Sequence, residues 1–278
     1  MEKWSKRGFG ILYLSNGTKY EGEWKNDKYE GYGINFYSNG DKYEGEWKNG
    51  LKEGFGIYYY SNGDKYEGEC KNGLKEGFGI LYFSNGEKYK GEWKNDLKEG
   101  FGILYFSNGT KYEGELKNDK IEGYGIYFGS NKFKYEGELK NNLKEGFGIE
   151  YSSNGYKYEG ELKNGKSEGY GILYFLTGDK YEGEFKNGKF EGYGIYNFYS
   201  INCKYKGKWK YGYPDGYGII YFSKGLKYEG KWDNNKMMKF GFLIKSIILI
   251  LYFFAYLYKI KNKIIIFILV LFLINYYY

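Results

Sequence analysis

The chain has 278 residues, among them 38 tyrosines, 45 glycines, one proline, two cysteines and no histidine. The absence of histidine removes the commonest general base and the commonest zinc ligand, and two cysteines cannot build a disulfide framework. Six lysines and no acidic residue follow Asp233, so most of the net charge of +7 lies there and the rest holds 36 basic against 35 acidic residues, a balance that argues against nucleic-acid binding.

The first ten residues, MEKWSKRGFG, contain no apolar stretch of the kind that forms the core of a signal peptide. Nothing in the cysteine usage requires an oxidising compartment either. We therefore expect the first part of the chain to face the cytosol.

The next feature is an internal repeat, which governs every other structural prediction. The tetrapeptide Lys-Tyr-x-Gly recurs every 23 residues, with a single spacing of 24, and a Gly-[Phe/Tyr]-Gly-Ile segment precedes each copy. Ten units follow one another and end near Asn235. Their tyrosines are Tyr20, Tyr43, Tyr66, Tyr89, Tyr112, Tyr135, Tyr158, Tyr181, Tyr205 and Tyr228.

Each unit is predicted to form a β-hairpin, as residues 8–25 illustrate. The pair Asn16-Gly17 suits the two central positions of a type I′ turn, which need positive φ, and six of the ten units carry Asn-Gly at this place. A two-residue turn fixes the pairing of the strands. The expected pairs are Ser15 with Thr18, Tyr13 with Tyr20, Ile11 with Gly22, and Phe9 with Trp24.

Alternation along the strands then divides the side chains between two faces. One face is expected to hold an aromatic band, in which a neighbouring ring covers Gly22. The other face receives Glu21 and Glu23 beside lysines. The band consists of Phe9, Ile11, Tyr13, Tyr20 and Trp24.

The two glutamates beside Gly22 allow two interpretations, a carboxylate pair for acid–base catalysis or members of a solvated charge ladder. A catalytic pair needs two different environments, whereas these residues recur in most units. Lysine also stands in place of glutamate in some units, at Lys90, Lys206, Lys208 and Lys231. We therefore expect a ladder, no enzymatic activity and no cofactor or metal.

The pattern Tyr-x-Gly-x-Trp, a short polar loop and Gly-x-Gly, at a period of 23 residues, resembles the MORN (membrane occupation and recognition nexus) repeat. The resemblance covers about residues 8–235. Five units depart from it at the Trp position, where they have Cys70, Leu116, Leu139, Leu162 or Phe185. The signature residues of the first two units are Tyr20, Gly22, Trp24, Gly31, Gly33, Tyr43, Gly45, Trp47, Gly54 and Gly56.

The resemblance implies an elongated array of antiparallel hairpins that serves as a scaffold, dimerises, or binds lipid and protein partners. We predict an all-β repeat array over residues 1–235, with about ten hairpins of 23 residues in a single sheet. Some family members add a lipid kinase or methyltransferase domain, and the 43 residues after Asn235 are too few for either. Cys70 and Cys203 lie six units apart, roughly 58 Å at two strand spacings per unit, which excludes a disulfide between them.

Residues 236–278 are predicted to form a hydrophobic tail, a membrane anchor of one or two short helices. Its apolar runs, 242–258 and 264–278, have 17 and 15 residues, against about 20 for a spanning helix. One run crossing, a helical hairpin, and two crossings are all open, and the second run crossing alone best satisfies the positive-inside rule. A low-complexity extension is the alternative. The lysines expected to flank the membrane are Lys245, Lys259, Lys261 and Lys263.

These features favour a non-enzymatic scaffold or tether, with a cytosolic array held to a membrane by its tail, a layout that resembles the junctophilins. The expected partners are membrane lipid at the tail, a phospholipid or protein on the array, and a second copy of the chain. The alternative is a soluble self-assembling or cytoskeleton-associated module whose tail packs in an oligomer interface. An enzyme such as a carbohydrate hydrolase is the weakest of the three hypotheses.

Overall fold

The computed structural model of the protein describes residues 7–129 and 132–237. The chain divides into two units, Met1–Asn235 and Lys236–Tyr278. The predicted C-terminal helical segment and the four predicted membrane-flanking lysines, Lys245, Lys259, Lys261 and Lys263, lie outside the described residues.

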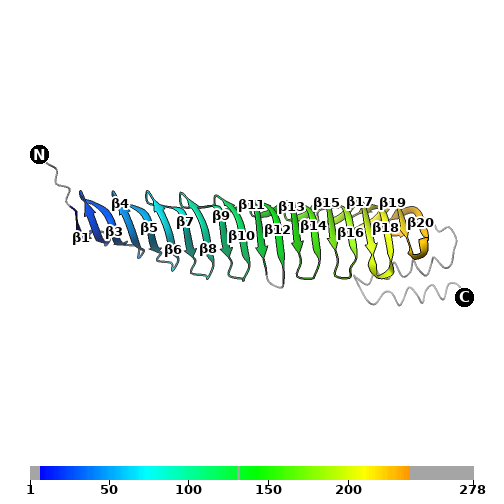
Figure 1. Ribbon diagram of the computed structural model, residues 1–278, viewed down its shortest axis with the longest axis horizontal. Helices are drawn as coiled ribbons and strands as arrows, with labels where there is room; N and C mark the ends of the chain where they lie inside the picture. Colours follow the sequence, from blue (N-terminus) through cyan, green and yellow to red (C-terminus); the bar gives the residue numbers. More distant parts are fainter. Residues whose placement is uncertain (1–6, 130–131, 238–278) are drawn as a thin grey trace. The chain divides into compact units, whose positions relative to one another are not determined.

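The first unit is a meander in which each strand pairs antiparallel with the strands before and after it (Figure 1). The hairpins begin with β1 (Arg7–Tyr13), β3 (Lys28–Phe36), β5 (Leu51–Tyr59), β7 (Leu74–Tyr82), β9 (Leu97–Tyr105), β11 (Lys120–Phe128), β13 (Leu143–Tyr151), β15 (Lys166–Tyr174), β17 (Lys189–Phe198) and β19 (Tyr213–Tyr221). Their second strands are β2 (Lys19–Lys25), β4 (Lys42–Lys48), β6 (Lys65–Lys71), β8 (Lys88–Lys94), β10 (Lys111–Lys117), β12 (Lys134–Lys140), β14 (Lys157–Lys163), β16 (Lys180–Lys186), β18 (Cys203–Lys210) and β20 (Lys227–Asp233).

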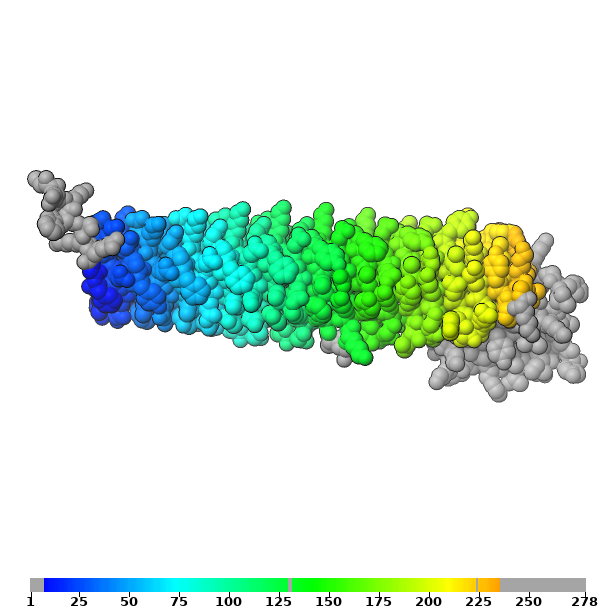
Figure 2. Space-filling model, in the orientation of Figure 1, coloured from blue at the N-terminus to red at the C-terminus, as the bar shows by residue number. Residues whose placement is uncertain are grey.

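The remaining elements are short: the 3₁₀ helices η1 (Tyr199–Ile201) and η2 (Ser223–Gly225), and strand β21 (Lys236–Met237). The predicted single sheet of ten antiparallel hairpins is confirmed. Figure 2 shows the array as a continuous, elongated stack of units from β1 to β20.

Two kinds of turn alternate along the sheet. Between β1 and β2, Gly17 takes a positive φ of 88°, and the Gly17 N–H donates to the Leu14 carbonyl. This is a three-residue loop, a type I turn followed by one left-handed residue. Between β2 and β3, Asn26 and Asp27 have φ of 50° and 60°, the two-residue type I′ geometry. The type I′ turn thus lies between units and not at Asn16-Gly17, where it was predicted.

The predicted pairing within the hairpins was therefore wrong by one residue. Because successive side chains alternate between faces, this shift places Phe9, Ile11 and Tyr13 on the face opposite to Tyr20 and Gly22. The predicted aromatic band is thus split between the two faces. The observed pairs are Leu12 with Tyr20, Ile11 with Glu21, Gly10 with Gly22, Phe9 with Glu23, and Gly8 with Trp24.

The face that carries Tyr20, which we call the packed face, is built on a tyrosine ring that lies over two paired glycines. A Cβ on Gly45 would lie 2.5 Å from the Cα of its partner Gly56 and 2.7 Å from the Tyr43 hydroxyl oxygen. That hydroxyl donates to the Glu46 carbonyl at 3.2 Å. The predicted cover of glycine by an aromatic ring is confirmed, and the ring belongs to the same strand. At most 6% of each side chain is exposed at nine such tyrosines: Tyr20, Tyr43, Tyr66, Tyr89, Tyr112, Tyr135, Tyr158, Tyr181 and Tyr205.

Aromatic contacts on the packed face join several units to the next. The Tyr20 ring meets Trp24 of its own unit and Trp47 of the next unit edge-on, at centroid distances of 5.3 and 5.5 Å. The Trp47 indole N–H donates to the Gly33 carbonyl at 3.2 Å. Cys70 fills a Trp position and is buried, and both cysteines are free.

Replacing a covered glycine tests the role of the rings. In Gly68→Ala the new Cβ would lie 2.5 Å from both the Gly79 Cα and the Tyr66 hydroxyl oxygen, so we expect a loss of about 2 kcal/mol in unfolding free energy. The control is Gly8→Ala, whose Cβ would meet nothing within 4 Å and should change stability by less than about 0.5 kcal/mol. Urea unfolding followed by fluorescence measures both, and equal losses would contradict this packing.

Burial of the tyrosines predicts unfolding in alkali. It raises the pKa of Tyr60, Tyr127 and Tyr158 to about 12, from the ordinary value of 10.0. Since the folded state holds these protons more tightly, their contribution to stability is complete below pH 10 and is lost as the pH rises towards 12. The last tyrosines to ionise should therefore do so as the circular dichroism of the sheet is lost. Ionisation of all tyrosines by pH 12 with an unchanged circular dichroism spectrum would contradict the prediction.

Candidate interaction surface

The face opposite to the packed face, which we call the open face, carries an exposed aromatic side chain in every unit. This residue stands between the two glycines of Gly-[Phe/Tyr]-Gly, and between 47% and 75% of it is exposed. It recurs on every second strand of the sheet. We call these ten residues the aromatic line: Phe9, Tyr32, Phe55, Phe78, Phe101, Tyr124, Phe147, Tyr170, Tyr193 and Tyr217.

A glutamate lies opposite each of the first eight members of the aromatic line, on the paired strand. Phe9 pairs with Glu23, for example, and Tyr32 with Glu46. Aromatic and acidic side chains therefore alternate across the sheet from β1 to β16. We call the eight exposed glutamates the carboxylate row: Glu23, Glu46, Glu69, Glu92, Glu115, Glu138, Glu161 and Glu184. In the last two units Lys208 and Lys231 take this place.

The backbone fixes the carboxylate row beside the aromatic line. Oε1 of Glu23 accepts the N–H of Tyr32 at 3.0 Å, and the same bond joins Glu92 to Phe101 at 3.1 Å. Between them lies a bulge where Gly31 has a φ of +62°, and a Cβ there would lie 2.5 Å from the Glu23 carboxyl carbon. The equivalent glycines have φ of 57–66°, whereas Gly216, beside Lys208, has 92°. The bulge therefore has one geometry beside a carboxylate and another beside Lys208.

A second row of glutamates on the open face is paired internally. Lys42 Nζ lies 2.9 Å from a Glu44 oxygen and 4.4 Å from the centre of the Tyr59 ring, and the Tyr32 hydroxyl donates to Glu44 at 3.0 Å. The bonds from Lys42 and Tyr32 hold the pKa of the Glu44 carboxyl below its usual value. The same pairs recur as Lys19–Glu21, Lys65–Glu67, Lys111–Glu113, Lys134–Glu136, Lys157–Glu159 and Lys180–Glu182.

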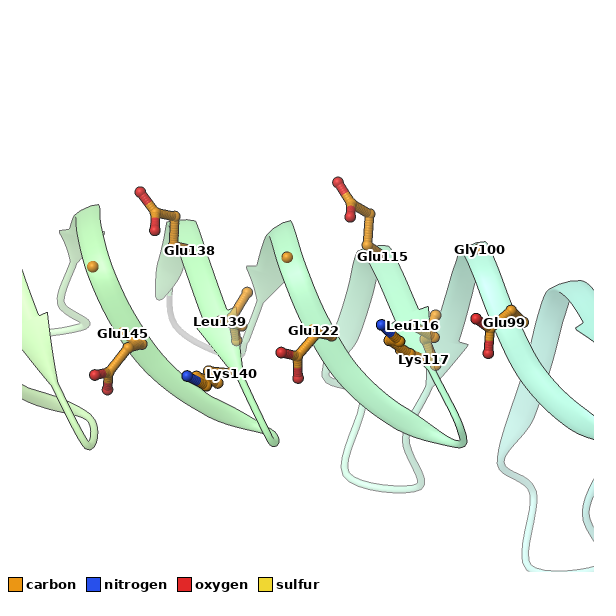
Figure 3. A pocket seen from close by; sticks show the side chains of 12 residues that line it. Glu99, Gly100, Glu115, Leu116, Lys117, Glu122, Glu138, Leu139, Lys140 and Glu145 are labelled. Carbon is orange, nitrogen blue, oxygen red and sulfur yellow. The ribbon is translucent and has the colours of Figure 1, made fainter.

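A third row of glutamates holds the type I′ turns that connect neighbouring units. Oε2 of Glu30, on β3, accepts the N–H of Asn49, in the type I′ turn between β4 and β5, at 3.0 Å. Further bonds of this kind join Glu53 to Asn72, Glu76 to Asn95, Glu99 to Asn118, Glu122 to Asn141, Glu145 to Asn164 and Glu168 to Asn187. Members of this row and of the carboxylate row line a shallow pocket around β10–β13, where Glu115 and Glu138 project from their strands in the same direction (Figure 3).

These contacts confirm that the repeated glutamates belong to ladders, because each row has a recurring structural role. Within residues 7–129 and 132–237, no group of three or more acidic or cysteine side chains is placed to hold a metal ion. In the same part of the chain, no helix has the length and apolar character needed to cross a membrane.

The predicted signature residues fall into two groups. Tyr20, Gly22 and Trp24 lie on the packed face with their equivalents Tyr43, Gly45 and Trp47, and Gly33 and Gly56 pair with the covered glycines. Gly31 and Gly54 instead form the bulges.

The exposure of the aromatic line was missed, because the assumed turn put Phe9 on the packed face. The available signal was a second Asn-Gly pair in several units, such as Asn49-Gly50, which forms the two-residue turn. Counting outward from that pair would have given the observed faces.

A protein-family model matches the repeat units found in the sequence. The model of the MORN repeat matches residues 20–42, 43–65, 66–88, 89–111, 112–132, 135–155, 158–180, 181–200 and 205–227. No curated protein sequence matches the chain.

Two solved structures align with more than half of this chain, but their overall similarity to it is weak. The TCP10 domain of CPAP from Danio rerio aligns with a TM-score of 0.41 and 12% identity, over 80% of this chain and 100% of that one. The TCP10c domain of Sas-4 from Drosophila melanogaster aligns with a TM-score of 0.32 and 16% identity, over 58% of this chain and 100% of that one. Such scores carry no argument about function.

The inter-unit bonds predict a measurable effect on stability. Glu53→Ala removes the acceptor of the Asn72 N–H, and we expect a loss of about 1 kcal/mol in unfolding free energy. Glu53→Gln keeps an amide oxygen at the same place and should lose clearly less. Thermal unfolding compares the two variants, and an equal loss would show that the hydrogen bond does not stabilise the turn.

Proposed function

The chain belongs to the MORN repeat family, and on this premise we propose that it is a non-enzymatic scaffold that binds a partner on its open face and is held to a membrane by its tail. The observation that carries the proposal is the aromatic line. A row of exposed aromatic side chains is typical of an interaction site, because aromatic residues are enriched at protein interfaces. MORN repeat proteins are generally structural or binding modules, which agrees with this role.

The architecture of the array suits a scaffold. Each unit is joined to its neighbours by ladder hydrogen bonds, and many junctions add aromatic contacts such as Tyr20–Trp47 or bonds such as Glu30–Asn49. Stability in such an array accumulates from one unit to the next. The array can therefore present the same surface many times without a second layer.

The sequence of the tail supports membrane attachment. Its apolar runs, 242–258 and 264–278, contain one lysine and no acidic residue, and the segment KIKNK separates them. Interfacial lysines and terminal tyrosines suit the two edges of a bilayer. We place the array in the cytosol, on the side where KIKNK satisfies the positive-inside rule.

Liposome flotation tests the anchor by comparing the full chain with residues 1–235. We expect only the full chain to float with neutral phosphatidylcholine vesicles and to stay bound in high salt. Salt is preferable to alkaline extraction here, because alkali would ionise the buried tyrosines and unfold the array. A full-length Leu269→Arg variant should float less, since a charge inside the second run costs about 3 kcal/mol at the bilayer centre.

The other outcomes separate the competing hypotheses. Flotation of residues 1–235 would show that the repeats themselves bind lipid. If neither form floats, the anchor is wrong, and sedimentation of the full chain would then test assembly through the tail. In sealed microsomes from cells that express the chain, protection of the array from added protease would contradict its cytosolic placement.

A further inference from the structure

We propose that the partner of the open face is an extended protein segment with a lysine or arginine at every third position. This inference rests on the proposed function and deepens it by naming the chemistry of the partner. It is carried by two properties of the aromatic line and the carboxylate row, namely their spacing along the sheet and their charge.

The spacing of the open face matches that of an extended chain. Strands lie about 4.8 Å apart, so features that recur on every second strand repeat about every 9.6 Å. An extended or polyproline II chain advances roughly 3.1–3.4 Å per residue and therefore covers this distance in three residues. A segment laid across the strands, along the array, can place the same side chain at every unit.

The chemistry of each unit favours a cation. In the second unit, the exposed Tyr32 ring stands between two exposed carboxylates, Glu23 on β2 and Glu46 on β4. A lysine or arginine above this position meets the face of a ring and an opposite charge at once. The bond between Glu23 and the Tyr32 N–H holds the carboxylate beside the ring before the partner arrives, which reduces the ordering cost of binding.

The charge along the surface narrows the choice of partner. The carboxylate row has eight acidic members, and Lys208 and Lys231 occupy the equivalent places in the last two units. Nucleic acid and an anionic bilayer would be repelled by this row. Lysines such as Lys42 and Lys65 pair with the second row of glutamates and so do not neutralise the carboxylate row. Exposed lysines also stand two residues after the carboxylates, as Lys48 does after Glu46, and within the described residues no ion pair joins these two.

Lys208 and Lys231 also give the site a direction and a length. A basic segment should lie over β1–β16 and end before Lys208, where the sign of the charge changes. Eight units at three residues each correspond to a segment of about 24 residues.

Peptides of defined spacing test the proposal on the full chain held in phosphatidylcholine vesicles. The probe is a fluorescent (Lys-Pro-Pro)8 peptide, whose proline keeps it extended. The controls are (Lys-Lys-Pro-Pro-Pro-Pro)4, which has the same composition and a different spacing, and (Glu-Pro-Pro)8. We expect the matched peptide to bind at least about tenfold more tightly than the respaced one, and the acidic peptide not to bind.

Two rows of glutamates are each interrupted by a lysine in this chain, at Lys208 and at Lys90, and these natural replacements suggest a pair of matched variants. Glu92→Lys with Glu115→Lys copies Lys208 into the carboxylate row and should weaken (Lys-Pro-Pro)8 binding about tenfold. Glu67→Lys with Glu113→Lys copies Lys90 into the second row, adds the same charge and should weaken binding much less. Phe78→Ala with Phe101→Ala removes two exposed rings and should weaken binding while leaving the unfolding temperature unchanged.

Several outcomes would overturn the inference. Equal affinity for the matched and respaced peptides, or equal weakening by both charge-reversed variants, would reduce the interaction to net charge. Absence of peptide binding also overturns it, and if the Phe78→Ala and Phe101→Ala variant then dissociates an oligomer in sedimentation, the occupant is a second copy of the chain. These failures leave vesicle flotation intact. Failure of the proposed anchor instead abolishes flotation, and peptide binding is then measured on the full chain without vesicles.

Discussion

The contact between a tyrosine ring and two paired glycines sets the geometry of the whole array. A ring such as that of Tyr43 can lie against the backbone only because Gly45 and Gly56 have no Cβ, and it is then nearly inaccessible to solvent. In several units the ring also touches the Trp position of the next unit, as Tyr20 does at Trp47. One small motif therefore closes a hairpin and joins it to its neighbour, which explains how a single sheet buries aromatic surface without a second layer.

The repeated glutamates divide into three rows with different structural roles. Glutamates such as Glu30 accept a hydrogen bond from the next type I′ turn, and those such as Glu44 are paired with lysine and tyrosine. Most of those in the carboxylate row bond to the bulge through one oxygen, and all remain exposed. A residue type that recurs in every unit is therefore mainly structural, and only the exposed part of one row is left to meet a partner.

Repetition also defines what the open face can recognise. An enzyme site needs a few residues in distinct environments, whereas this surface repeats one environment at a constant spacing. A partner gains affinity only if its own chemistry repeats at that spacing, since each unit alone offers little binding energy. The replacement of glutamate by Lys208 and Lys231 breaks the repetition at one end and so gives the surface a direction.

The sequence alone determined the repeat, the number of hairpins, the covering of Gly22 by an aromatic ring and the separation of Glu21 and Glu23 from that ring. These follow from a 23-residue period and from two-residue alternation within a strand, which local sequence expresses directly. Only the tertiary structure decided which of two turns sets the pairing of the strands, because Asn16-Gly17 and Asn49-Gly50 have the same sequence. The first pair lies in a three-residue loop and the second forms a two-residue turn. That single residue moves Phe9 and its nine equivalents from the packed face to the open face, since a shift of one position reverses every side chain along a strand.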